Sequence, residues 1–170
     1  MAAPAPVNLR CEYRVNPLGI DELQPRLSWQ LADRRRGARQ TAYQVVVTAV
    51  PPGGGAAGGT LWDSGKVASD ENTQIVYAGT PLGSRQRCAW KVRVWDQLDT
   101  PTPWSDAATW EMGLLAREEW QAQWIGSALV GGRWTTIPCP YLRTSFTLTK
   151  PIARARLYAT ALGVYECHLN

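Results

Sequence analysis

Residues 88–95, Cys-Ala-Trp-Lys-Val-Arg-Val-Trp, alternate in polarity with a period of two, and this alternation is the strongest constraint on the fold. Successive side chains of a β-strand point to opposite faces, so the segment is predicted to be a strand with two unlike faces. One face is apolar throughout and is predicted to be buried: Cys88, Trp90, Val92 and Val94. The other is predicted to face outward: Ala89, Lys91, Arg93 and Trp95. There, the two cations are expected to shield the Trp95 ring with their stems or through a cation–π contact.

Strand patterns recur along the first two thirds of the chain, in residues 7–13, 26–31, 41–50, 60–65, 72–79 and 108–113. Together with 86–96, they make seven short segments that are separated by turn residues and accompanied by no clear amphipathic helix. This spacing predicts an all-β fold, a sandwich of two antiparallel sheets. Trp29 in 26–31 is expected to pack against Trp90 across the core, because large rings bury the most area per residue.

Composition excludes several classes of function. A chain of 170 residues with 45% hydrophobic content can bury a core as one domain or two. The net charge of +4 is too small and too dispersed to predict a nucleic-acid groove. The arginine cluster at 34–39 has no interleaved aromatic residue and is predicted to be a solvated turn. No membrane-length apolar stretch and no signal peptide is visible, so we expect no membrane partner and a cytoplasmic protein, or a secreted one without its signal.

Metal and cofactor chemistry is not expected either. The four cysteines are too scattered for a paired motif and are predicted to be free and mostly buried: Cys11, Cys88, Cys139 and Cys167. The single histidine, His168, is predicted to be an exposed strand residue rather than a ligand. The glycine-rich stretch 51–59 lacks the Lys-Ser/Thr pair of a phosphate-binding loop and is predicted to be a flexible connection.

Tryptophan is the one residue type that suggests a ligand, since the chain holds nine and sugars stack on exposed indole rings. The candidates for carbohydrate contact are Trp62, Trp95 and Trp104. The competing interpretation, which we favour, is that loops or a neighbouring domain cover these rings. No pair of carboxylates marks a cleft beside them, and turn formation accounts for Asp96, Asp99 and Asp106.

Segments 26–31, 43–49, 82–94 and 103–113 resemble a fibronectin type III-like domain. In that fold, the position of Cys88, six residues after Leu82, usually holds a tyrosine whose hydroxyl ties down a corner of the sandwich. Because the hydroxyl is absent here, we expect the corner to be held by other groups.

A narrower resemblance covers most of the chain. Six segments, in this order, are similar to the N-terminal part of bacterial α-L-rhamnosidases of glycoside hydrolase family 78: 61–67, 90–96, 104–115, 118–126, 140–148 and 155–170. The resemblance implies a fibronectin-like sandwich at 6–113, a linker with a short helical turn at 114–125, and an incomplete jelly-roll domain at 126–170. It also implies that the carboxylates that hydrolyse terminal α-L-rhamnosides with inversion lie in a downstream (α/α)6 barrel.

No residue of this chain is assigned a catalytic role. Glu118 and Glu119 are neighbours on the linker and are predicted to be solvating charges, since adjacent residues do not face each other. Glu111 and Glu166 lie on predicted strands without an evident partner. We therefore expect a non-catalytic portion of an α-L-rhamnosidase, inactive alone, whose partners are the other domains and rhamnose-containing glycosides. The alternatives are a stand-alone carbohydrate-binding module and a protein-interaction sandwich.

Overall fold

The computed structural model describes residues 3–51, 58–129, 131–152 and 154–169. The chain divides into two compact units, Met1–Glu119 and Trp120–Asn170. Eight strands and a single turn of 3₁₀-helix, η1 (Arg117–Glu119), form the first unit as far as it is described.

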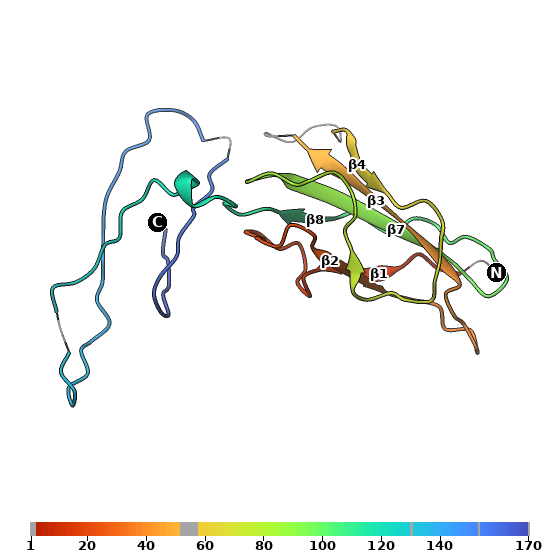
Figure 1. Cartoon of the computed structure of the whole chain (residues 1–170), viewed down its shortest axis with the longest axis horizontal. Coiled ribbons are helices and arrows are strands. Elements are labelled where there is room, and N and C mark those ends of the chain that lie inside the picture. Colours follow the sequence, from red (N-terminus) through yellow and green to blue (C-terminus); the bar gives the residue numbers. More distant parts are fainter. Residues whose placement is uncertain (1–2, 52–57, 130, 153, 170) are drawn as a thin grey trace. The chain divides into compact units, whose positions relative to one another are not determined.

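The first unit is a sandwich of two antiparallel sheets (Figure 1). The smaller sheet has the order β1 (Val7–Cys11), β2 (Arg26–Gln30), β6 (Ile75–Val76). The larger has the order β4 (Thr60–Asp63), β3 (Ala42–Val50), β7 (Arg87–Trp95), β8 (Ala108–Glu111), and the short β5 (Val67–Ala68) also pairs with β3. The long strands β3 and β7 pair over their full length, from Ala42 opposite Trp95 to Val50 opposite Arg87. The predicted all-β sandwich is confirmed.

Each of the seven predicted strand segments contains an observed strand. The sequence prediction missed β5, because two residues are too short to show a period. In the connection predicted at 51–59, residues 52–57 lie outside the described part of the chain. The arginine cluster is a turn, as expected, with Arg34, Arg36 and Arg39 exposed.

The alternation of β7 predicts its burial correctly on the apolar face, where the four side chains are at most 4% exposed. Trp29, Trp90 and Trp110 are each 1% exposed in a core cluster to which both sheets contribute. The indole N–H groups of Trp90 and Trp110 have no hydrogen-bond partner in the described structure. An unpaired buried donor costs roughly 1–3 kcal/mol, whereas burying an indole of about 150–250 Å² gains roughly 4–6 kcal/mol at ~25 cal/mol per Å². Ring burial therefore outweighs the lost hydrogen bond.

The Trp29 ring, unlike the other two, is held by the buried side-chain amide of Gln40. Trp29 Nε1 donates to Gln40 Oε1 at 3.0 Å, and Gln40 Nε2 donates to the carbonyl oxygens of Ser69 and Glu71 at 3.1 and 2.7 Å. The ring also meets the edge of Tyr43, with centroids 5.3 Å apart. Gln40, 3% exposed, thus ties the indole of the smaller sheet to the segment that follows β5.

The corner before β7 is held without the tyrosine that the fibronectin-like pattern leads one to expect. Leu82 is buried, and Gln86 Oε1 accepts a hydrogen bond from the Gly83 amide at 2.8 Å. The Gln86 amide donates back to the Gly83 carbonyl at 3.2 Å. The glutamine side chain therefore closes the corner locally.

The edge of the larger sheet at β8 is covered by the loop between β1 and β2. The Glu111 amide donates to Pro17 O and the Ile20 amide to Glu111 O, both at 3.0 Å. Asn16 Oδ1 accepts from the Thr109 amide at 2.8 Å. Because the loop uses these backbone groups, they are not available to template pairing with another chain.

The second unit contains no helix and no strand among its described residues, apart from an isolated bridge between Gly132 and Thr135. The strands expected at 126–170 are not formed there, so the jelly-roll domain stays a prediction. Large apolar side chains of this unit are exposed, with Trp134 at 89% and Tyr141 at 100%. Strands gain stability by pairing and by burying one face, and apart from that bridge the described residues of this unit do neither.

The described residues include no helix that is both long and apolar enough to cross a bilayer.

Gln40→Leu should destabilise the sandwich by about 2–4 kcal/mol, because the Trp29 N–H and two carbonyl groups lose their buried partner. Urea unfolding followed by circular dichroism measures the change. Gln24→Leu, at an exposed position, is the control and should shift stability by less than about 0.5 kcal/mol. Equal effects from both variants would contradict the anchoring role.

The thiols should fall into two classes. Burial raises the pKa of Cys11 and of Cys88 to about 12, so both stay protonated and shielded at pH 8, whereas Cys139 and Cys167 are exposed. Ellman's reagent should therefore titrate two thiols rapidly in the folded chain and all four in denaturant. A Cys88→Ser variant should show the same number of rapidly reacting thiols as the unchanged chain. A smaller number would mean that Cys88 reacts in the folded chain and is not buried.

Candidate functional site

The three tryptophans proposed for sugar contact do not lie on one surface. Trp62 on β4 pairs with the buried Val47 of β3, packs against the core and meets the edge of Tyr77 at 5.5 Å between centroids. Trp95 pairs with Ala42, whose position in β3 differs in parity from Val47, so its ring belongs to the opposite face of the larger sheet. A single platform that uses all three rings is therefore not formed.

Trp95 and Trp104 belong to a stack of alternating rings and cations, which we call the cation–π ladder. The Arg93 guanidinium lies 5.0 Å from the Trp95 ring centroid and 4.8 Å from that of Trp104. Lys66 Nζ covers Trp95 at 4.9 Å and Lys91 Nζ covers Trp104 at 4.8 Å. A cation over an indole face gains about 0.5–1 kcal/mol when exposed and about 2 when desolvated.

The ladder leaves little indole surface for a ligand. Trp95 lies on the outer face, as the alternation predicts, but it is only 8% exposed. One covering cation, Arg93, was expected; the other is Lys66, from the segment before β5, because Lys91 is directed to Trp104 instead. Trp104 is half-buried. A sugar stacking on Trp95 would have to displace a cation first.

Hydrogen bonds hold Arg93 in place between the two rings. Its Nε donates to Gln44 Oε1 at 3.0 Å, and Gln44 Nε2 donates to Asp63 Oδ1 at 2.7 Å. The hydrogen bond from Gln44 and a second from the Gly65 amide hold the pKa of Asp63 below its usual range. Three strands, β7, β3 and β4, therefore share one polar network on the outer face.

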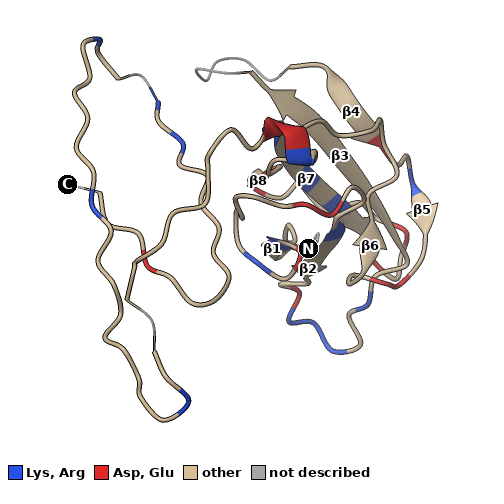
Figure 2. Cartoon of the chain, turned by 60° about the vertical axis from the view of Figure 1, so that its left-hand side comes forward, with Lys and Arg blue, Asp and Glu red and all other residues tan. Residues whose placement is uncertain are grey.

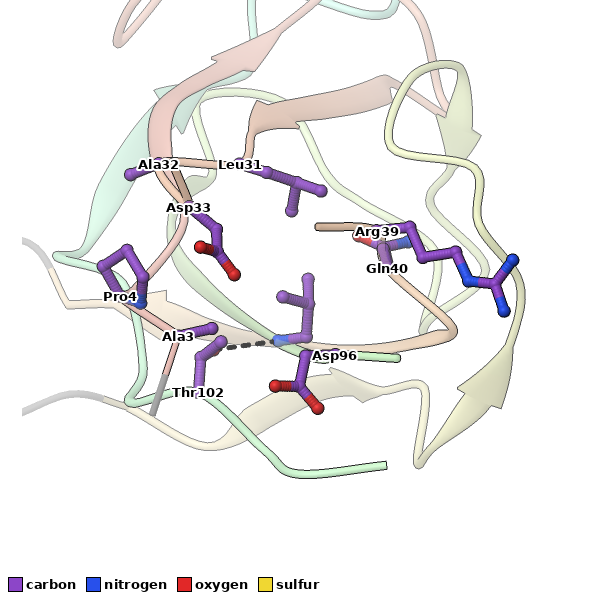
Figure 3. Close-up of a pocket in the computed structure, with 10 residues that line it drawn as sticks. Ala3, Pro4, Leu31, Ala32, Asp33, Arg39, Gln40, Asp96 and Thr102 are labelled. Atoms are coloured by element: carbon purple, nitrogen blue, oxygen red, sulfur yellow. Dashed lines mark hydrogen bonds between the residues drawn. The ribbon is translucent and has the colours of Figure 1, made fainter. Parts of the chain in front are cut away.

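The second polar cluster is built around Arg35. Its Nη2 lies 2.6 Å from Asp33 Oδ2 and 2.8 Å from Asp96 Oδ2. Asp96 Oδ1 accepts hydrogen bonds from the Leu98 and Thr100 amides at 2.9 and 3.1 Å, which confirms its predicted role in the turn. Asp33 and Asp96 border a small cavity, from which the Arg39 side chain extends away (Figure 3). Its volume of about 10 Å³ accommodates roughly one water and no sugar ring.

The electrostatics of these carboxylates do not suit acid catalysis. An inverting glycosidase needs one carboxylic acid of raised pKa and a carboxylate base on the other side of the bond. Hydrogen bonds from Arg35 hold the pKa values of Asp33 and Asp96 below their usual range, and Arg26 does the same for Glu12. All three are ionised at neutral pH and cannot donate a proton.

Two of the four glutamates considered in the sequence analysis, Glu119 and Glu166, have contacts that the sequence did not predict. Glu119 is not a solvating charge, because it is half-buried and bonded to Ser84 and Arg85. Glu166 has a partner, with its Oε1 3.1 Å from His168 Nε2, and both side chains are exposed. Glu118 is exposed, as predicted, and Glu111 is buried on β8. Sequence spacing could not reveal the contacts of Glu119, which join residues 34 and 35 positions apart.

No group of three or more His, Cys, Asp or Glu side chains suited to a metal ion occurs in the part of the chain that the structure describes.

Comparison with known proteins matches this architecture to a class of domain. A family model described as "Rha78A-like, N-terminal immunoglobulin domain" matches residues 6–116. The class is thus an immunoglobulin-like β-sandwich that lies at the N-terminus of a larger protein. The chain belongs to this family of Rha78A-like N-terminal immunoglobulin domains.

Curated relatives extend the similarity beyond the sandwich. The chain is 40% identical over 162 residues to an α-L-rhamnosidase of Alteromonas sp. (strain LOR), covering 92% of this chain and 18% of that protein. It is 42% identical over 178 residues to an α-L-rhamnosidase of Streptomyces avermitilis, covering 94% of this chain and 17% of that one. The chain therefore spans less than a fifth of the length of these relatives.

Solved structures show a similarity to the same group of proteins. The α-L-rhamnosidase of Dictyoglumus thermophilum matches with a TM-score of 0.65 and 38% identity, over 74% of this chain and 14% of that protein. The S. avermitilis α-L-rhamnosidase, solved in complex with L-rhamnose, matches with a TM-score of 0.64 and 41% identity. The match covers 72% of this chain and 12% of that protein. In each case the likeness is confined to a small part of the larger enzyme.

Arg93→Ala should unstack both rings of the cation–π ladder and lower the free energy of unfolding by about 1–2 kcal/mol, the sum of two such contacts. Tryptophan emission should shift to longer wavelength as Trp95 gains solvent. Arg36→Ala removes the same charge from an exposed turn and serves as the control. A spectrum and a stability that both match those of the control would exclude the ladder.

Proposed function

We propose that this chain is the non-catalytic N-terminal portion of an α-L-rhamnosidase that hydrolyses terminal α-L-rhamnosides in a downstream (α/α)6 barrel. Its sandwich serves to position the domains that come after it in the chain. The observation that carries this proposal is the extent of similarity: over 90% of this chain aligns with less than a fifth of proteins named α-L-rhamnosidase.

The chemistry of the described residues supports a non-catalytic role. The carboxylates of the Arg35 cluster are ionised and bound, and the cavity beside them is too small for a sugar. The rings that could hold a sugar are largely covered by cations or packed against the core. Bond cleavage would therefore depend on groups outside these 170 residues.

The second unit supports the inference that its partners are other domains of the same enzyme. Its apolar side chains are exposed in quantity, Trp124, Ile125, Trp134, Tyr141, Phe146, Leu162 and Val164 among them. Exposed apolar area of this extent is characteristic of surfaces that another part of a protein covers. We propose that downstream strands pair with residues 126–170 and complete a jelly-roll domain.

The purified 170-residue chain should release no nitrophenol from 4-nitrophenyl α-L-rhamnopyranoside, whereas a polypeptide extended with its downstream sequence should release it. The reason is that the proposal assigns the required acid and base pair to the downstream barrel. Removal of residues 1–113 from the extended polypeptide should lower the yield of folded protein and the rate at which it hydrolyses this substrate. Turnover by the short chain alone would refute the proposal.

A second candidate is carbohydrate binding at Trp104, which is half-buried, unlike the buried Trp95, and lies beside the exposed Lys91. Titration of the chain with L-rhamnose, followed by tryptophan fluorescence, tests it. A saturable change that Trp104→Ala abolishes and Trp62→Ala retains would establish a binding module. A flat response would leave the positioning role as the function of this region.

A further inference from the structure

The chain does not leave the sandwich freely after β8 but turns back against the corner that precedes β7. The Met112 amide donates to Gln86 O at 2.8 Å, and the Arg85 amide donates to Gly113 O at 3.0 Å. The Leu115 amide then donates to Ser84 Oγ at 2.9 Å. Three successive contacts therefore fasten the start of the linker to one corner.

The Glu119 carboxylate completes this attachment from the end of η1, the red turn beside the β7 label in Figure 2. Oε2 accepts hydrogen bonds from Ser84 Oγ and, at 3.2 Å, from the Ala116 amide. Oε1 lies 3.1 Å from Arg85 Nη1. The hydrogen bond from Ser84 is the main cause that holds the pKa of Glu119 below its usual range. Ser84 thus links the carboxylate to the Leu115 backbone.

Packing restrains the same segment from the other side. Leu115 packs partly buried against the core, and the Gly113 amide donates to Ile20 O at 2.7 Å. A Cβ on Gly113 would lie 3.4 Å from the Gly19 backbone, which is as close as most side chains tolerate. Arg85 adopts a φ of +62°, a conformation that persists only where surrounding contacts require it. The exit of the chain is therefore enclosed by two loops.

We propose that residues 82–86 and 113–119 form a clasp, centred on Glu119, that fixes the position and direction of the backbone at the point where the sandwich ends. The clasp makes the sandwich a rigid mount for the polypeptide after Glu119. This inference rests on the proposed positioning function and names the residues that perform it.

Amide hydrogen exchange in the 170-residue chain tests whether the clasp exists. Glu119→Ala should speed exchange at Leu115 and Ala116 by about five-fold or more, the effect of losing one or two hydrogen bonds. Glu118→Ala removes the neighbouring, exposed carboxylate and should leave both rates unchanged. Unchanged exchange at Val92 in β7 verifies that each variant is folded. Equal rates in the two variants would overturn the clasp.

A distance measurement in the extended polypeptide tests the mount. Nitroxides are placed at an Asp70→Cys position on the sandwich and at the exposed Cys139, with Cys167 replaced by serine. Glu119→Ala should broaden the distribution of distances relative to Glu118→Ala, and equal widths would overturn the mounting role. Neither readout requires hydrolysis, so failure of the clasp is distinguishable from failure of the proposed rhamnosidase function.

Discussion

The sandwich depends on burying three indole rings between its sheets. Trp29 comes from the smaller sheet, and Trp90 and Trp110 from neighbouring strands of the larger one. The gain from this burial outweighs the cost of two indole N–H groups that have no partner among the described residues, while the third donates to Gln40. The rings thus fill the core between the two sheets.

The outer face of the larger sheet shows why an abundance of tryptophan does not by itself indicate a sugar site. Arg93 lies between Trp95 and Trp104, and lysines cover the two rings further along the cation–π ladder. The same side chains that make the face basic also cover Trp95, which is only 8% exposed. The face joins distant segments of the sandwich, which suits the positioning role proposed for it.

Membership in a family of N-terminal immunoglobulin domains gives the clasp its significance. A sandwich linked to its neighbour by a free tether would only keep the two domains at high local concentration. The proposed clasp would instead restrict the orientation of the backbone up to Glu119, because η1 is bonded to the corner at Ser84 and Arg85. Chemistry carried out elsewhere in a polypeptide can depend on such a restriction without any residue of the mount touching a substrate.

The sequence by itself determined the seven main strands and the buried face of β7, because period-two alternation and turn residues are local properties of the chain. The tertiary structure decided which cation covers Trp95, why Trp62 lies apart from Trp104, and that Glu119 is a bound residue. Those facts depend on side chains brought together from separate strands and loops. Lys66, for example, reaches Trp95 only because β5 and β7 both pair with β3, and no spacing within a single segment records that proximity.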